Sequence, residues 1–210
     1  MLKIYHANSQ TFRDKYSLEI LLEQLPKSLH AKALRYHRAQ DAFNFVLGKL
    51  MLQRSLLDLG VEASLEDVTF NENEKPSLEG NVFFNISHSG DLVVCGICQD
   101  GEIGVDIEKE KVIELANFVK FFTPKEWTDI NEHAFPLKKF FWYWVRKESI
   151  IKALGVNLSY LNKIELEADK DFFIENEKQW FLKDLYFDEG YFFAICSEVN
   201  YESVEMFSFE

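Results

Sequence analysis

Cysteine, proline and long apolar runs are all scarce in this sequence. The 210 residues include 3 Cys, 4 Pro and 9 Gly. Three cysteines are too few for a disulfide framework and are typical of a reducing compartment. No apolar run reaches the ~20 residues that a membrane-spanning helix needs, and residues 1–6 lack the apolar stretch of a signal peptide. We therefore expect a globular, cytoplasmic protein without a membrane partner.

Positive charge is also scarce. The chain has 23 Lys and Arg against 35 Asp and Glu, a formal net charge of −12. This balance argues against a nucleic acid partner, because such binding depends on neutralising phosphates. The charge is uneven, since residues 1–54 contain 9 bases and 4 acids, whereas residues 165–210 contain 3 bases and 13 acids. The basic N-terminal part suits a small phosphorylated ligand.

Two long helical patterns each end at a glycine. One covers about residues 27–59 and stops at Gly60, and the other covers about residues 137–154 and stops at Gly155. Glycine is common just past a helix end. A Gly-Val-x-x-Ser segment begins at both glycines, which are 95 residues apart. This repetition predicts an internal duplication.

Strand-like segments follow each helical pattern without an intervening helix. Residues 92–98 and 191–196 are apolar and read as buried strands, and Cys95 and Cys98 fall on opposite faces as core residues. A long helix followed by several strands is typical of an α+β architecture. The turn-like residues 99–102 mark the boundary. We expect two tightly packed α+β halves, 1–100 and 101–210, each a long helix on an antiparallel sheet, with the ligand between them.

The segment Gly-Val-Asp-Ile-Glu at 104–108 places two carboxylates on one strand face. Asp106 and Glu108 point to the same side, and Val105 and Ile107 point to the core. Two close carboxylates repel unless a cation lies between them, and Mg²⁺ is the first candidate. The alternative is an edge strand with solvated acids.

The segment 144–155 combines an indole, an acid and a base on one helix face. Glu148 and Lys152 are four residues apart, and Trp144 lies one turn before Glu148. In a functional interpretation, Glu148 is a third metal ligand and Lys152 binds a phosphate. The alternative is a surface helix with an ordinary Glu–Lys pair.

A polar segment, Asn-Ile-Ser-His-Ser at 85–89, lies between two apolar runs. Its hydroxyls, imidazole and backbone amides suit an anion, and the alternative is a plain hairpin with a solvated histidine. Upstream, Lys75 precedes Pro76, whose fixed φ makes a small rigid element suited to a base or a phosphate. On its own this pair is a turn.

Together, the four segments resemble the Sfp-type 4′-phosphopantetheinyl transferases in content, order and spacing. They read Lys-Pro at 75–76, Phe-Asn-Ile-Ser-His-Ser at 84–89, Gly-Val-Asp-Ile-Glu at 104–108 and Trp-x-x-Lys-Glu-x-x-x-Lys at 144–152. Residues 2–5 and 35–42 are also similar to the family. The resemblance implies a pseudo-dimer of two α+β halves with coenzyme A between them, which agrees with the duplication.

The resemblance also implies roles for individual residues. Asp106, Glu108 and Glu148 would bind Mg²⁺, and Glu148, Lys152 and Glu108 are the expected catalytic residues. The expected coenzyme A contacts are His88 and Lys152 near the phosphates, Lys75, Pro76 and Ser87 near the adenylate, and Lys32, Arg35 and Arg38 near the 3′-phosphate. Lys147 is a further expected contact. Asn44, Leu29 and Glu74 depart from the family, which has basic residues near the first two positions and glycine at the third.

The implied reaction moves 4′-phosphopantetheine from coenzyme A to a serine hydroxyl of an apo acyl or peptidyl carrier protein. Adenosine 3′,5′-bisphosphate is released, and Mg²⁺ is required. Glu148, Glu108 or a metal-bound water would accept the serine proton. The alternatives are a Mg²⁺-dependent phosphohydrolase or nucleotidyl transferase, and a catalytically silent coenzyme A-binding protein. A monomer is expected, because two internal halves supply the interface that a smaller enzyme builds by dimerising.

Overall fold

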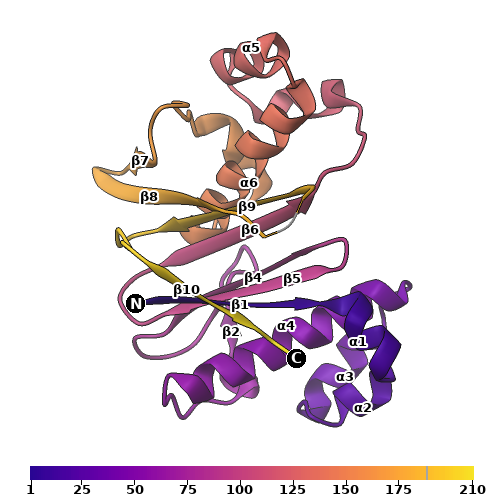
Figure 1. The fold of residues 1–210 in the computed structure, drawn as a ribbon. Coiled ribbons are helices and arrows are strands. Elements are labelled where there is room, and N and C mark those ends of the chain that lie inside the picture. The colour runs from indigo at the N-terminus through magenta and orange to yellow at the C-terminus, as the bar shows by residue number, and fades with distance from the viewer. Residues whose placement is uncertain (188) are drawn as a thin grey trace.

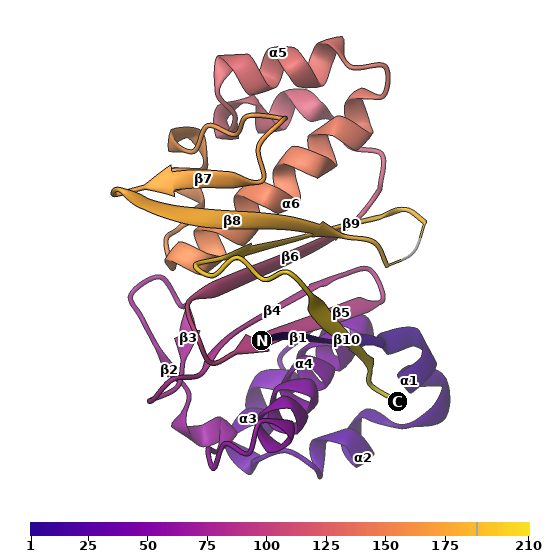
Figure 2. The same ribbon diagram turned by 60° about the vertical axis from the view of Figure 1, so that its left-hand side comes forward.

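Two four-stranded sheets stack face to face, and one long helix covers the outer face of each sheet (Figures 1 and 2). The computed structural model describes residues 1–187 and 189–210. The strand orders are β10-β1-β5-β4 and β6-β9-β8-β7, and β2 and β3 form a small separate hairpin. The predicted α+β architecture is confirmed.

The N-terminal half contains most of the small helices. Its elements are β1 (Leu2–Asn8), α1 (Ser9–Lys15), α2 (Leu18–Leu22), α3 (Lys27–Ala33), α4 (Ala39–Asp58), a 3-10 turn (Leu65–Asp67), β2 (Thr69–Phe70), β3 (Pro76–Ser77), β4 (Phe83–Ser89) and β5 (Leu92–Cys98).

The C-terminal half repeats the same plan of a strand, a long helix and further strands. Its elements are β6 (Ile103–Lys109), a 3-10 turn (Leu115–Phe121), α5 (Pro124–Glu132), α6 (Pro136–Leu154), a 3-10 turn (Leu158–Lys163), β7 (Phe172–Glu175), β8 (Lys178–Leu185), β9 (Tyr191–Ser197) and β10 (Val204–Ser208).

The duplication is visible in the topology. The order β1-α4-β4-β5 in the first half matches β6-α6-β8-β9 in the second, and the sheet orders β1-β5-β4 and β6-β9-β8 agree. Gly60 and Gly155 follow α4 and α6 with φ of 67° and 66°. The predicted glycine stops and internal duplication are therefore confirmed.

The prediction of a single helix over residues 27–59 is wrong. The chain forms α3 and α4 with a break between them, where Arg38 has an extended backbone (φ −101°, ψ 131°). The break lets α3 fold back against α4. Ala33 is the only buried residue of α3. If α3 and α4 formed one straight helix, α3 would extend beyond the core.

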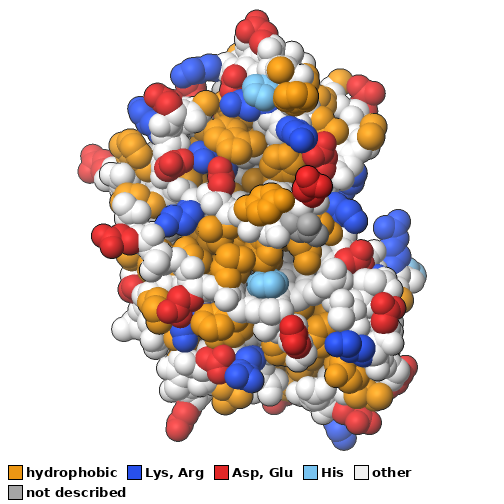
Figure 3. Space-filling view, viewed as in Figure 1, with side chains coloured by type: hydrophobic (Ala, Val, Ile, Leu, Met, Phe, Trp, Pro, Cys, Tyr) orange, Lys and Arg blue, Asp and Glu red, His pale blue; other side chains and the backbone are white. Residues whose placement is uncertain are grey.

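The core between the sheets is apolar and holds the two halves together. Leu2 and Ile4 of β1 pack there with Val105 and Ile107 of β6, as predicted for the last two. Cys95 faces the core under α4 and Cys98 the core between the sheets, so their assignment as core residues is confirmed. Apolar side chains also reach the surface along the level where the halves meet (Figure 3).

The C-terminal segment crosses back to the first half. Strand β10 pairs in parallel with β1, with Leu2 opposite Val204 and His6 opposite Ser208. The N-terminal sheet is therefore completed by residues from the end of the chain. None of the helices in the described ranges has the length and apolar character needed to cross a bilayer.

Candidate active site

A glycine allows β6 to approach the backbone of α6. A Cβ atom on Gly104 would lie 2.1 Å from the carbonyl oxygen of Ser149 and 2.3 Å from the amide nitrogen of Ala153. No side chain fits there, because backbone atoms of a packed helix cannot move aside. This close contact brings the acids of β6 beneath the polar face of α6.

Asp106 is the buried centre of the group, with 3% of its surface exposed. Its Oδ1 accepts hydrogen bonds from Lys152 Nζ at 2.5 Å and from Ser87 Oγ at 2.9 Å. Its Oδ2 is buried and has no hydrogen-bond partner among the described residues. Burial raises the pKa of Asp106 even though Lys152 and Ser87 act against the shift. A buried carboxylate oxygen without a donor is costly, so Oδ2 is an open position for a cation.

Glu108 and Glu148 complete a row of three carboxylates. Ser89 donates a hydrogen bond to Glu108 Oε2 at 2.6 Å, and burial raises the pKa of Glu108. Burial also raises the pKa of Glu148 to about 7, and the negative charges of Asp106 and Glu108 add to the shift. Both shifts show that burial makes the charged forms of these two acids costly.

The donor set fits a hard divalent cation. All three residues offer carboxylate oxygens, which Mg²⁺ prefers, and one of those oxygens is buried without a donor. Within residues 1–187 and 189–210, however, no three acidic, imidazole or thiol side chains are drawn together into a formed metal site. The residues suit Mg²⁺ in chemistry, and closing around it requires side-chain movement.

Lys152 and His88 are the basic side chains beside the acids. Burial disfavours the charged form of Lys152, but Asp106 and Glu148 outweigh it and raise its pKa. His88 follows Ser87 on β4 and is exposed. Partial loss of hydration and the nearby Lys152 charge lower its pKa, which favours a neutral imidazole. The structure therefore brings Ser87, His88 and Lys152 close to Asp106, although the resemblance implied an adenylate contact for Ser87.

Lys75 lies at the C-terminal end of α6 and links the two halves. Its ammonium group pairs with Glu102 and donates a hydrogen bond to the carbonyl oxygen of Ala153 at 2.5 Å. Asn73 donates to the carbonyl oxygen of Gly155 at 2.9 Å. A cation at a helix C-terminus is favourable. This cation is therefore already engaged by protein groups, and the ligand contacts expected of Lys75 and the adjacent Pro76 stay predictions.

Lys147 does not reach the site, and the ligand contact predicted for it is contradicted by the structure. Its side chain is buried in the C-terminal half, where it pairs with Glu126 at 2.5 Å. It also donates to the carbonyl oxygen of Ile164 at 2.9 Å. One residue along a helix turns the side chain by about 100°, so Lys147 faces the core while Glu148 faces the acids.

Of the remaining basic candidates, Lys32 lines a second cavity, between α3, α4 and β2. Lys32 and Lys49 line this cavity of about 290 Å³. The Lys32 ammonium lies 5.7 Å from the ring centre of Phe45 and 5.8 Å from that of Phe70. Arg35 is exposed in the break between α3 and α4, and Arg38 is exposed at its end. Lys49 was not predicted from the sequence. Its position four residues after Phe45, on the same face of an otherwise apolar helix, could have indicated that it lies near Lys32 and this cavity.

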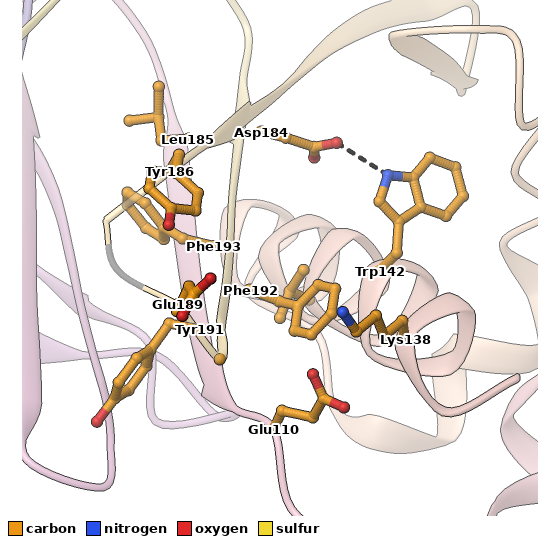
Figure 4. A pocket seen from close by; sticks show the side chains of 12 residues that line it. Glu110, Lys138, Trp142, Asp184, Leu185, Tyr186, Glu189, Tyr191, Phe192 and Phe193 are labelled. Atoms are coloured by element: carbon orange, nitrogen blue, oxygen red, sulfur yellow. Dashed lines mark hydrogen bonds between the residues drawn. The ribbon is translucent and has the colours of Figure 1, made fainter. Parts of the chain in front are cut away.

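A larger cavity of about 430 Å³ lies along β9, the strand next to β6 (Figure 4). Glu108 is the cross-strand partner of Phe192, so their side chains share one face of the sheet. Phe192, Lys138 and Glu110 converge at one end of the cavity, while Asp184 accepts a hydrogen bond from Trp142 at 2.9 Å. A ligand held by the carboxylates therefore has an aromatic cavity one strand away.

Known proteins match both halves of the chain. Residues 13–99 match the family model described as "4'-phosphopantetheinyl transferase, N-terminal", and residues 102–203 match "4'-phosphopantetheinyl transferase superfamily". The 4'-phosphopantetheinyl transferase ffp of Bacillus subtilis is 30% identical over 93% of this chain and 92% of its own length. Sfp of Bacillus subtilis (strain 168) is 31% identical over 79% of each chain. For gsp of Aneurinibacillus migulanus the identity is 32%, over 68% of this chain and 61% of that protein.

Proposed function

Because this chain belongs to the 4′-phosphopantetheinyl transferase superfamily, we propose that it transfers 4′-phosphopantetheine from coenzyme A to a serine hydroxyl of an apo carrier protein. Adenosine 3′,5′-bisphosphate is the other product. The acceptor is an acyl or peptidyl carrier protein. The relatives carry this transferase in their names, and the resemblance of the four sequence motifs supports the same reaction.

The observation that carries the proposal is the buried, unpartnered Oδ2 of Asp106 beside two further acids with raised pKa values. A divalent cation would stabilise such a site. The pyrophosphate of coenzyme A also offers oxygen ligands that a divalent cation binds. Asp106, Glu108 and Glu148 would hold Mg²⁺. When bound, Mg²⁺ would neutralise charge on the phosphates.

The protein groups then have defined tasks. The serine oxygen forms a bond to the β-phosphorus of coenzyme A, and the bond from that phosphorus to the bridging oxygen of the nucleotide breaks. Lys152 neutralises phosphate charge, because its ammonium group is held at Asp106 by a 2.5 Å hydrogen bond. Glu108, Glu148 or a metal-bound water would take the serine proton.

Intact-protein mass spectrometry tests the reaction directly. An apo carrier protein incubated with this protein, coenzyme A and Mg²⁺ is expected to gain one phosphopantetheine, and EDTA is expected to prevent the gain. If coenzyme A binds in calorimetry but no carrier protein among several gains mass, the chain is instead a silent coenzyme A-binding protein.

In the same assay, Asp106→Asn distinguishes a metal ligand from a buried acid with no part in the reaction. The amide keeps the shape of the side chain but loses the charge, so we expect transfer to fall by more than the about 10- to 100-fold typical of losing an outer-shell partner. Thermal unfolding checks that the variant is folded. Full activity in a folded Asp106→Asn protein would contradict the metal assignment.

We further propose that the enzyme acts as a cytoplasmic monomer. All three cysteines are free and buried, which suits a reducing compartment. The apolar core between the two sheets already supplies an interface between equivalent halves. Sedimentation analysis of the purified chain tests the oligomeric state.

A further inference from the structure

Strands β4 and β6 run side by side although they belong to different sheets. Three side chains of β4 accept hydrogen bonds from backbone amides of β6. The pairs are Asn85 Oδ1 with Val105 N at 3.0 Å, Ser87 Oγ with Ile107 N at 3.3 Å, and Ser89 Oγ with Lys109 N at 3.0 Å. Each acceptor precedes its donor by 20 residues, so the two strands are parallel and in register. We call these three contacts the side-chain ladder.

The equivalent strand edge in the first half is closed differently. Strand β1 is the first-half equivalent of β6, and the outer edge of β1 pairs with β10 by backbone hydrogen bonds. Backbone pairing satisfies an edge completely and involves no side chain. At β6 the edge amides are satisfied by side chains instead, and those side chains have further hydrogen-bonding capacity.

Both serines of the ladder use that capacity on an acid. An amide must donate, so Ser89 Oγ accepts from Lys109 N, and the hydroxyl proton is left to donate to Glu108 Oε2 at 2.6 Å. Ser87 does the same with Ile107 N and Asp106 Oδ1. Each hydroxyl therefore connects an acid to the backbone amide of the residue after it. This contact limits the rotation of the acid's side chain.

We propose that Asn85, Ser87 and Ser89 are positioning residues that hold β6 in register with β4 and aim Asp106 and Glu108 at the shared cation. Asn85 anchors the buried end of the ladder, because the residue and the amide that it accepts from are both buried. Ser89 orients Glu108. The proposal rests on the proposed function, since it concerns how the acids meet Mg²⁺ and coenzyme A.

Ser89→Ala is the sharpest test, because it removes both hydrogen bonds and leaves every proposed ligand in place. Calorimetry of coenzyme A binding at increasing Mg²⁺ is expected to show about a 10-fold rise in the Mg²⁺ concentration for half-maximal binding, as for loss of an outer-shell partner. Affinity in EDTA should be unchanged. Ser89→Thr keeps the hydroxyl and should restore most of the Mg²⁺ response.

Ser197→Ala is the matched control. Ser197 is a buried β9 serine whose hydroxyl donates to the carbonyl oxygen of Val199 at 2.9 Å, away from the acids. We expect it to leave the Mg²⁺ response unchanged. Amide hydrogen exchange should show faster exchange at Lys109 in Ser89→Ala, with Val105 unaffected.

The outcomes separate the two proposals. A wild-type protein without Mg²⁺-dependent coenzyme A binding would overturn the proposed function and the positioning role with it. A wild-type protein that binds, with Ser89→Ala responding to Mg²⁺ in the same way, would overturn the positioning role alone. A lowered unfolding temperature with an unchanged Mg²⁺ response would have the same meaning, because the ladder would then only join strands.

Discussion

At the scale of single residues, Glu148 makes the site pH-dependent. Its pKa is raised from 4.5 to about 7, chiefly by burial. Between these values the folded protein holds a proton that the unfolded chain has lost, so stability falls as the pH rises through this window and levels off above it. The shift amounts to about 1–3 kcal/mol after allowance for solvent screening.

Glu148→Gln should remove this dependence. In EDTA, the thermal midpoint of the wild type is expected to fall between about pH 5 and about pH 8 more than that of the variant. Added Mg²⁺ should recover stability at the higher pH in the wild type only. Glu62→Gln, at an exposed position, is the control. Parallel pH profiles for wild type and Glu148→Gln would show that Glu148 is not the source.

Two lysines show where residue-level prediction succeeds and fails. The four-residue spacing places Lys152 beside Glu148, and the structure brings both to Asp106. Lys147 lies in the same motif but turns to the core, where Glu126 is its partner. Helical geometry separates Lys147 from Glu148, but a partner 21 residues away depends on how α5 packs. No local pattern carries that information.

At the scale of elements, the Lys147–Glu126 pair fastens α5 to α6. Glu126 also accepts hydrogen bonds from the backbone amides of Thr123 and Leu166, both at 2.9 Å. Lys147→Met would leave the Glu126 carboxylate buried without its cation. We expect a loss of about 3–5 kcal/mol in unfolding free energy. Urea denaturation measures this.

A double variant keeps the prediction testable if the single variant does not fold. Replacing the pair by Lys147→Met with Glu126→Gln removes both charges and should recover part of the lost stability. Coenzyme A affinity of the folded double variant should match the wild type. A Lys147→Met protein of normal stability with weakened coenzyme A binding would instead support the ligand contact suggested by the sequence motif.

Gly104 controls the contact between β6 and α6. In Gly104→Ala the new methyl group would meet helix backbone at 2.1 Å, so α6 must move and carry Glu148 and Lys152 away from Asp106. Overpacking usually costs about 1–3 kcal/mol, and we expect at least that loss together with weaker Mg²⁺-dependent coenzyme A binding. Urea denaturation and calorimetry measure the two effects.

Gly96→Ala is the matched control on β5. A Cβ there meets only side-chain atoms, the nearest being Val105 Cγ1 at 2.9 Å, and these atoms can rotate away. The control should therefore lose less stability and keep coenzyme A binding. Equal losses in both variants would show that the close approach of β6 to α6 has no special role in the site.

The sequence predicted elements with strong internal periodicity better than their connections. The second long helix and strand β5 appear close to their expected residues. The break between α3 and α4 was missed, because residues 34–38 contain neither glycine nor proline. The break follows from tertiary packing, since α3 gains contact with α4 only by folding back.

At the scale of the whole molecule, a duplicated fold carries a single carboxylate row. Asp106 and Glu108 occupy the fourth and sixth positions of β6, and Tyr5 and Ala7 occupy the same positions of β1. Tyr5 and Ala7 pack into the core under α4 instead of meeting a ligand. The duplication therefore conserved the scaffold while only the second half has the acids.

The two halves depend on each other for a closed core. Separated at the turn between residues 100 and 101, each fragment would expose the apolar face that now lies between the sheets, and the first would also lose the β10 partner of β1. Chains of about 100 residues with a large exposed apolar face are marginally stable.

We expect that neither fragment 1–100 nor fragment 101–210 gives a folded NMR spectrum alone. We expect the mixture of the two to give a dispersed, wild-type-like spectrum. A second fragment lacking residues 204–210 should assemble more weakly, because β1 then keeps an open edge. A folded spectrum from fragment 1–100 by itself would show that the first half is an independent domain and that the contact between the sheets is not required for folding.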